Sequence, residues 1–435
     1  MLIEFRVENH RSIRDEQALS MEAADAADSA DPRSRQVQGY SKRLVPAVAL
    51  YGANASGKSN VLSALALMRA TVLASHRLWP PEGGVDRDPF AWGSKSDTPS
   101  LFEITVLVEG VRYQYGYVAD DDQFLEEWLY AWPGSRKQTW LERDGQSFKF
   151  GEHLSGENRA IELITRPNAL FLSAAVQLKH EQLLPLYRWF LVLREVNVAR
   201  RIHPTPISHA HVQWASDLYS LASRGLLTLR VDEEGVLAQR PERFLDLLRA
   251  ADVGIVDMKI EESGDESLSP ASRRRGMERR VLLRHRSDGD DAWLPLAEES
   301  QGTRTLFSMG SPILEVIDSG GVLLVDELES SLHPALAARV IALFNDPKTN
   351  PRNAQILFTT HDTHLLGSLL GEPPLRRDQV WLTEKDTDGA TCLYPLTDYK
   401  PRPSENLERG YLQGRYGAIP FLGNLAAVSN PADGQ

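Results

Sequence analysis

The stretch GANASGKS, Gly52 to Ser59, decides the fold of this chain. It fits the pattern G-x-x-x-x-G-K-[ST] and follows VPAVALYG, an apolar run that predicts a short strand ending in glycine. The run after it, SNVLSALALMRATVLASH, has apolar residues at helical spacing and predicts a helix. A strand, a glycine-rich loop and a helix in this order are the setting in which such a loop binds phosphate.

Each residue type in this loop has a physical reason to be there. Glycines let the backbone N–H groups wrap around a phosphate, and the start of the helix adds partial positive charge. Lys58 is expected to reach the β- and γ-phosphates of ATP, and Ser59 to ligate Mg²⁺. A glycine-rich turn that fits by chance is the alternative, and the matching strand and helix argue against it. The residues predicted to bind the nucleotide are Gly52, Asn54, Ser56, Gly57, Lys58, Ser59 and Asn60.

The stretch GGVLLVDE, Gly320 to Glu327, predicts the second part of the same site. Four consecutive apolar residues indicate a buried parallel strand, and Asp326 follows at its carboxyl end, where open α/β sheets present ligand-binding groups. Asp326 is expected to hold Mg²⁺, and Glu327 to orient or deprotonate the attacking water. The acids could instead stabilise the dipole of the next helix, but this does not account for the strand and the distant loop together.

Another apolar strand, QILFTTHD, ends at His361. A histidine at a strand end is usually only a polar residue at a boundary. Here it follows the Asp-Glu pair by one helix-length unit, so His361 is predicted to reach the γ-phosphate and take part in hydrolysis.

The polar stretch ESQGT, Glu299 to Thr303, precedes a helix-like run and predicts a second anion-binding corner at a helix N-terminus. The plainer interpretation is that Ser300 caps the helix. One ATP already has its cradle at Gly52 to Ser59, so a second corner is unexplained within one subunit. Pro312 is expected to kink or end this helix.

Composition sets limits on the class of protein. The chain has 435 residues, a net charge of −12 and a single cysteine, which fits a reducing cytoplasm and excludes an intrachain disulfide. There is no apolar run of about 18 residues and no signal-peptide pattern at the N-terminus, so we expect no membrane association. The acidic balance argues against a uniformly basic nucleic-acid surface. It leaves open a local one at Arg273 to Arg280.

The order of predicted elements indicates an α/β protein whose head is split by a long insertion. Residues 1–70 are the N-terminal part of the head, 71–157 a β-rich lobe, 158–251 a helical insertion or arm, and 252–435 the C-terminal part of the head. The run PLYRWFLVLREV is read as helix within that arm. The acids of EKDTDG are read as a hairpin turn rather than a metal site.

Four motifs, YGANASGKSN, ESQGT, LLVDELESSLHP and FTTHD, together resemble those of ABC-type ATPases of the SMC/RecF/OLD group. The chain looks most similar to the stand-alone AAA family ATPases of bacterial anti-phage defence, a circle that includes OLD nucleases and the ATPase subunit of PARIS-type systems. The resemblance covers the two ends of the chain, and residues 69–298 match only in outline. It implies an ABC-type P-loop head.

The resemblance also implies that two subunits pair head to tail. Ser300 and Gly302 of one subunit would then act in trans on the ATP held by Lys58 and Ser59 of the other. The segment ESSLHP, Glu329 to Pro334, would cross the dimer interface. The corner SQGTR has one glycine and departs from the LSGGQ signature of transporters.

Three further residues are candidates by resemblance only. Arg11, in ENHRSI, is expected near the nucleotide. The group has a glutamine that approaches the metal, for which Gln177 is the candidate and Gln213 the rival.

The function expected from these features is slow ATP hydrolysis in a homodimer or higher homo-oligomer. It would control a partner effector, a nuclease or toxin from a neighbouring gene, in anti-phage defence. The alternative is a RecF/SMC-like DNA-repair ATPase that binds DNA directly. A third is a scaffold that binds ATP without turnover.

Overall fold

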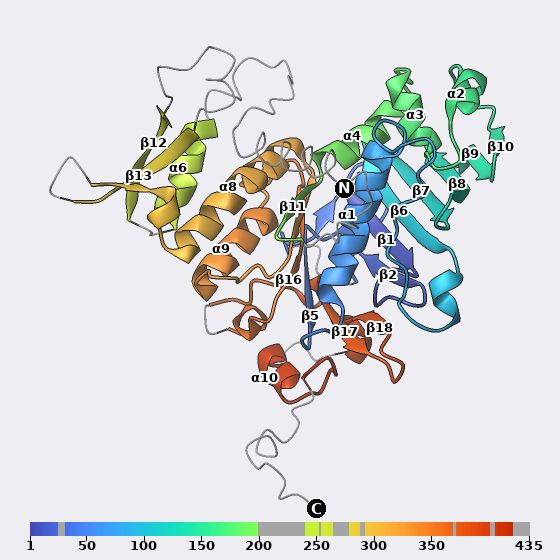
Figure 1. Ribbon diagram of the computed structural model, residues 1–435. Helices are drawn as coiled ribbons and strands as arrows, with labels where there is room; N and C mark the ends of the chain where they lie inside the picture. Colours follow the sequence, from blue (N-terminus) through green and yellow to red (C-terminus); the bar gives the residue numbers. More distant parts are fainter. Residues whose placement is uncertain are drawn as a thin grey trace, which may run out of the picture.

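The computed structural model shows an α/β protein, which confirms the fold class expected from the sequence. Two large sheets enclose helix α1, and a small third sheet lies at one side (Figure 1). No helix in the part of the chain described is long and apolar enough to cross a membrane. The residues described are 1–24, 31–198, 240–251, 254–263, 278–287, 292–368, 371–400 and 405–420.

The larger sheet has seven antiparallel strands in the order β10-β9-β8-β7-β6-β1-β2. Consecutive strands from β6 to β10 pair as neighbours and form an antiparallel meander, whose first turn is Glu109-Gly110. Strands β1 and β2 precede the P-loop in the chain but belong to this sheet, so the β-rich lobe draws on both sides of the loop. Its strands are β1 (Leu2–Glu8), β2 (Gln17–Ser20), β6 (Ser100–Val108), β7 (Val111–Ala119), β8 (Phe124–Trp132), β9 (Gln138–Asp144) and β10 (Ser147–Phe150).

The second sheet has six strands in the order β11-β15-β16-β5-β17-β18, all parallel except β18. Strand β16 lies between β15 and β5, so the ends of the three strands that carry the predicted site are side by side. The strands are β5 (Ala47–Gly52), β11 (Arg194–Val196), β15 (Val322–Val325), β16 (Gln355–Thr359), β17 (Val380–Lys385) and β18 (Thr391–Pro395).

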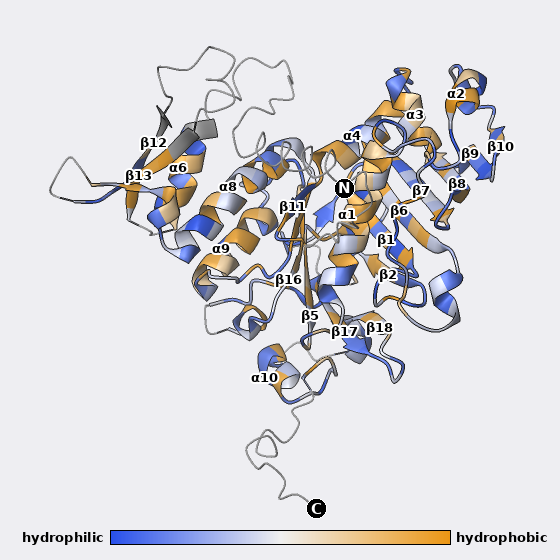
Figure 2. Cartoon of the chain, viewed as in Figure 1, coloured by the Kyte–Doolittle hydropathy of each residue, from blue (hydrophilic) through white to orange (hydrophobic). Residues whose placement is uncertain are grey.

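Alternation along β5 assigns its two faces to two cores. Val48 and Leu50 pack with α1 and the antiparallel sheet, whereas Ala49 and Tyr51 pack with helices on the other face. Burial on both faces explains the unbroken apolar run that the sequence shows. Figure 2 shows β5 and β16 in hydrophobic colours between the flanking helices. These helices are α1 (Lys58–Ala74) on one face and α8 (Gln301–Ser319), α9 (Pro334–Asn345) and α10 (Leu407–Leu412) on the other.

The predicted helical insertion is only partly helical where it is described. Helices α3 and α4 pack beside α1, but α4 ends at Val192 and Arg194–Val196 form β11 at the edge of the parallel sheet. The prediction of helix through these residues was wrong, because pairing with β15 overrides the local helical pattern. Residues 199–239, including Gln213, lie outside the described residues. The helices are α2 (Asn158–Ile164), α3 (Phe171–Gln177) and α4 (Leu184–Val192).

Helix α6 (Arg240–Ala250) packs against α8 and leads into a three-stranded antiparallel sheet. The two longer strands, formed by the stretches GIVDMKIEE and RRVLLRHRS, pair antiparallel. Of the basic run Arg273 to Arg280, residues 273–277 lie outside the described residues and the rest begins β13. The strands are β12 (Ile255–Ser263), β13 (Glu278–His285) and β14 (Trp293–Pro295).

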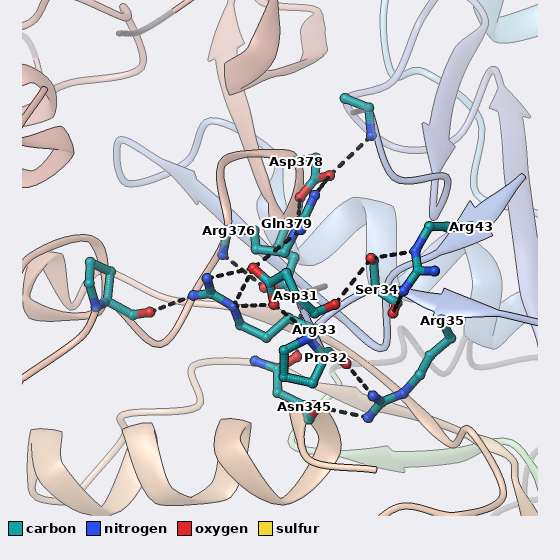
Figure 3. A network of polar contacts seen from close by, with 12 residues as sticks. Asp31, Pro32, Arg33, Ser34, Arg35, Arg43, Asn345, Arg376, Asp378 and Gln379 are labelled. Carbon is teal, nitrogen blue, oxygen red and sulfur yellow. Dashed lines mark hydrogen bonds and ion pairs between the residues drawn. The ribbon is translucent and has the colours of Figure 1, made fainter. Parts of the chain in front are cut away.

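A buried polar network fixes the segment after the first strands to the C-terminal half (Figure 3). Asp31 accepts from Arg33 and pairs with Arg376 at 3.2 Å, and Arg376 also binds Asp378 at 2.9 Å. Arg35 donates to the main chain at the end of α9. The N-terminal and C-terminal parts of the head are therefore joined by charge-assisted hydrogen bonds as well as by strand pairing.

Candidate functional site

The loop between β5 and α1 is held at close quarters by its neighbours. Gly52 and Gly57 have φ of 155° and 107°. A Cβ at Gly52 would lie 2.4 Å from the carbonyl oxygen of Thr383, and one at Gly57 would lie 2.1 Å from Oγ1 of Thr391. Both positions require glycine, because a side chain at either one would clash with the adjacent strands. Asn54 is exposed on this loop.

Lys58 is folded back onto its own loop. Its Nζ donates to the carbonyl oxygens of Gly52 at 2.9 Å and Ala53 at 3.0 Å. Burial lowers the pKa of Lys58 from 10.5 to about 8, although the carboxylates of Asp326, Glu329 and Glu327 act to raise it. The carboxylates therefore only partly offset the cost of burying the ammonium charge. A triphosphate in the loop would give this charge a stronger partner.

Ser59 and Asp326 come together as the sequence predicts. Ser59 Oγ donates to Asp326 Oδ1 at 2.8 Å, and Thr359 Oγ1 donates to the same oxygen at 2.6 Å. A hydroxyl and a carboxylate are hard oxygen ligands of the kind that Mg²⁺ prefers. Their separation is close to the roughly 3 Å between neighbouring oxygens in an octahedral Mg²⁺ shell. The residues present therefore fit a magnesium ion.

Glu327 is held in an uncommon backbone conformation beside this acid. Its φ is 54°, and its amide donates to Thr359 Oγ1 at 2.7 Å. The left-handed conformation costs a residue with a Cβ about 1 kcal/mol, and such costs persist where the surroundings impose them. The side chain is exposed and has no hydrogen bond or ion pair among the described residues. Its carboxylate is accessible for contact with a substrate.

His361 lies at the end of β16, on the same edge of the sheet. Its amide donates to Glu329 Oε1 at 2.6 Å, and its side chain is exposed. Partial desolvation of the imidazole and the charge of Lys58 lower the pKa of His361. The histidine is therefore neutral at pH 7 and close enough to Lys58 to feel its charge.

Arg11 and Asn60 lie beside the loop but have protein partners. Arg11 Nε donates to Asp88 Oδ2 at 2.8 Å, and Asn60 Nδ2 donates to Ser12 Oγ at 2.6 Å. A nucleotide contact by either side chain requires a change of partner, so both remain proposals.

Gln177 lies far from this site within the chain, so the structure does not bring it to the residues predicted to hold the metal. Ser173 of α3 binds the amide of His76, just beyond the far end of α1. Helix α1 has 17 residues, so Lys58 and that end are separated by about 25 Å. Helix α3 is only about 10 Å long, which does not cover the distance. The resemblance predicts a glutamine near the metal, but Gln177 does not occupy such a position in this chain.

A chain of hydroxyl groups that sequence reasoning missed braces the loop from the C-terminal hairpin. Ser56 Oγ and Thr383 Oγ1 are 2.6 Å apart, and Thr391 Oγ1 donates to the carbonyl oxygen of Ser56 at 2.8 Å. Ser12 Oγ and Thr391 Oγ1 are 2.7 Å apart. No sequence motif marks these threonines, so the sequence alone carries no signal for them. The acids of the hairpin turn between them bind Arg14, as expected for a turn rather than a metal site.

We expect Thr391→Val to weaken ATP binding about tenfold, because it leaves the buried carbonyl of Ser56 without its donor, at a cost of about 1–3 kcal/mol. Titration with a fluorescent ATP analogue measures the effect. Thr391→Ser keeps the hydroxyl and should restore binding. Cys392→Val, at the next residue of the strand, is the control and should bind as the natural chain does. Equal weakening in the Ser and Val variants would contradict a role for the hydroxyl.

The lowered pKa of Lys58 predicts a proton linked to ATP binding. A bound triphosphate should raise this pKa back above its value of about 8 in the free protein. Binding at about pH 8.5 should then take up roughly three-quarters of a proton, and affinity should fall as pH rises through 8. Calorimetry in two buffers of different ionisation enthalpy measures this uptake. Lys58 is already charged at about pH 6.5, so uptake from this group that persists there would contradict the assignment.

The segment ESQGT, predicted to be a second anion-binding corner, lies at the start of α8. Ser300 Oγ accepts from the amide of Thr303 at 3.1 Å, so the helix-cap interpretation holds within this chain. A Cβ at Gly302 would lie 2.7 Å from the carbonyl oxygen of Ser331, which places the corner against the segment Glu329–Pro334. Among the described residues, no hydrogen bond or ion pair joins Ser300 or Gly302 to the phosphate loop of the same chain. Helix α8 continues to Ser319, so Pro312 does not end it.

The parallel sheet, the phosphate loop and the acid-bearing strand define a P-loop protein of the ATPase class. A family model described as "AAA domain, putative AbiEii toxin, Type IV TA system" matches residues 47–367, and the chain belongs to this family. The match spans the loop, both acids and His361. It confirms the ATPase relationship expected from the motifs.

Among solved structures, the chain is similar to an Smc head bound to the C-terminal winged-helix domain of ScpA. The TM-score is 0.41 and the identity 11%, with 90% of this chain and 96% of that chain covered. A second similar structure is an Smc head domain with an extended coiled coil bound to the C-terminal domain of ScpA, derived from Pyrococcus furiosus. Its TM-score is 0.38 and its identity 10%, with 95% and 98% covered. No curated protein matches the chain.

Proposed function

We propose that this protein binds Mg–ATP, dimerises head to tail through two shared ATP sites, and hydrolyses ATP slowly. The observation that carries this proposal is that the hydroxyl groups of Ser59 and Thr359 both donate to Oδ1 of Asp326. Lys58 and Glu327 lie beside this oxygen. These groups come from α1, β15 and β16, elements far apart in the sequence. A structural role alone does not account for a buried lysine, a buried carboxylate and a strained acid at one edge of a sheet.

Each residue has a distinct part in the proposed reaction. Lys58 leaves the carbonyl oxygens of its loop and binds the β- and γ-phosphates. When bound, Mg²⁺ is held by Ser59 and Asp326 and neutralises charge that develops on the phosphates. Glu327 orients the attacking water and accepts its proton, and His361 contacts the γ-phosphate. Thr359 holds Asp326 and Glu327 at a fixed spacing.

The shared site is supported by the position of the second corner. Ser300 and Gly302 begin a helix of 19 residues, whose N-terminus carries partial positive charge, and they lie against the segment Glu329–Pro334. We propose that this corner meets the γ-phosphate held by Lys58 of a second subunit. Arg11 is proposed to approach the nucleotide after release from Asp88.

The biological role is proposed from the family. Its model is described by a putative AbiEii toxin and a type IV toxin–antitoxin system. We propose that the ATP state of this protein controls a partner effector, a nuclease or toxin encoded nearby, in anti-phage defence in the cytoplasm.

The mass of the protein in solution tests the shared site. With Glu327→Gln slowing turnover, addition of ATP and Mg²⁺ should raise the mass from monomer to dimer. Ser300→Arg in the same background should abolish the increase, because a long cationic side chain fills the corner. Ser308→Arg is the matched control, since Ser308 is exposed farther along the same helix. Light scattering after size-exclusion chromatography gives the masses.

A monomer under every condition, with ATP bound, would reduce Ser300 to a helix cap and contradict the shared site. A constant oligomer that Ser300→Arg leaves intact would move assembly to another surface. A partner that copurifies with the ATP-bound form but not with the nucleotide-free form would support effector control.

A further inference from the structure

Three arginines surround a pocket that has no part in the proposed ATP site. The pocket has a volume of about 460 Å³ and opens where α6 ends and β12 begins, beside the end of β13. Pockets of a few hundred Å³ accommodate small-molecule ligands. Its lining residues are Arg249, Gly254, Ile255, Val256, Arg284 and Arg286.

The three guanidinium groups are fixed to different degrees. Arg249 donates from Nη2 to the carbonyl oxygen of Val256 at 2.6 Å, which holds its side chain against the pocket wall. Nε of Arg284 is buried and has no hydrogen-bond partner. Within the described part of the chain, the side chain of Arg286 has no hydrogen bond or ion pair. Buried donors without partners are uncommon, and a ligand with acceptor oxygens would satisfy them.

Among the described residues of this pocket, arginines outnumber carboxylates, although the net charge of the chain is −12. Two described carboxylates face the three arginines. Asp246 lies 3.1 Å from Arg249, and Asp257 lies 4.0 Å from Arg284.

The strand that carries two of the arginines also contacts the second anion-binding corner. Successive side chains of a strand point to opposite faces, so His285 faces away from Arg284 and Arg286. His285 Nε2 lies 2.6 Å from Glu299 Oε1, and the side chain of Glu299 is only 4% exposed. Glu299 immediately precedes Ser300. One short hydrogen bond therefore links β13 to the residue that precedes the first turn of α8.

We propose that this pocket binds a small phosphate-bearing molecule and that its occupancy adjusts the corner at Ser300 and Gly302. Guanidinium groups match the geometry of phosphate oxygens and bind them in pairs, which favours phosphate over a carboxylate or an apolar ligand. The binding site stands on its own geometry, whereas its regulatory meaning rests on the proposed function of the corner. The ligand would act as an effector that tunes assembly of the shared ATP site.

Calorimetric titration with inorganic pyrophosphate tests the site, in the full chain carrying Lys58→Ala so that the phosphate loop lacks its cation. We expect one binding event, weakened about tenfold or more by either Arg284→Gln or Arg286→Gln. Arg284 lies over the ring of Trp293, and Arg112→Gln is the matched control because Arg112 lies over the ring of Trp132, in the seven-stranded antiparallel sheet. It should leave the affinity unchanged. A single-stranded oligonucleotide without terminal phosphate, titrated in parallel, separates a nucleic-acid backbone from a small ligand.

Hydrogen exchange at residues 301–303 tests the coupling without any need for ATP turnover. Pyrophosphate should slow exchange there, and His285→Gln should remove this effect while leaving pyrophosphate binding intact. Equal binding in the arginine variants and the control would overturn the site, as would binding of the oligonucleotide alone. Binding without any change in exchange would overturn the coupling. Loss of ATPase activity in other experiments would affect neither result.

Discussion

Glu327→Gln is expected to bind ATP and to lose almost all turnover. The amide has the shape of the carboxylate but cannot accept a proton, and a positioned general base contributes about 100-fold or more to such a reaction. The side chain makes no hydrogen bond or ion pair among the described residues, so its replacement should leave the fold intact. Phosphate release under saturating ATP gives the rate, and retention of labelled ATP gives the binding.

Glu329→Gln is the comparison for this variant. Glu329 accepts the amide of His361 at 2.6 Å and lies two residues farther along the chain. We expect a smaller loss of rate, because its contact positions the end of β16 rather than the reacting water. Turnover by Glu327→Gln at the rate of the natural chain would assign the base elsewhere and leave the protein as an ATP-binding scaffold.

Lys58→Ala should abolish detectable ATP binding at micromolar nucleotide. Lys58 is the only cationic residue in the loop Gly52 to Ser59, and charge-assisted hydrogen bonds contribute about 1.5–3 kcal/mol each. Loss of one such bond corresponds to about 10- to 100-fold in affinity, before the loss of longer-range attraction is counted. Fluorescence titration with an ATP analogue, with and without Mg²⁺, measures the change.

The folded protein should tolerate this substitution well. The ammonium is partly desolvated and bonded only to two carbonyl oxygens, and its depressed pKa shows that burial of the charge is unfavourable. We therefore expect thermal stability to be equal or slightly higher without ATP. Lys95→Ala, which removes an ion pair with Glu8 near the antiparallel sheet, is the control for ATP binding. Unchanged affinity in Lys58→Ala would contradict the site.

The sequence alone was enough to predict segments whose structure depends mainly on residues close to them in the chain. The loop from Gly52 to Ser59 carries its own requirements for glycine and lysine, and the run before Asp326 is apolar because both of its faces are buried. Both patterns are readable without knowledge of distant neighbours. The meander from β6 to β10 was also predictable, since each of its strands pairs with the next one in the chain.

The parts that could not be predicted depend on contacts between distant segments. Arg194–Val196 become a strand only because the edge of β15 is available. Gln177 matches the required residue type, but its place at the far end of α1 is decided by how α3 packs. Thr383 and Thr391 show no motif, and their meaning appears only when the hairpin meets the loop.

The hydroxyl contacts that join Ser56 to Thr383 and Thr391 form between segments that are synthesised at different times. Ser56 and Thr383 are 327 residues apart, so the phosphate loop is synthesised long before the residues that hold it in place. Contacts of such long sequence separation form late in folding. Nascent chains shorter than about Thr391 would carry the complete phosphate motif and still present it unsupported. Under the proposed function, a chain that stops before this hairpin would carry the phosphate motif without the contacts that support it, and we expect it to bind ATP more weakly than the full chain.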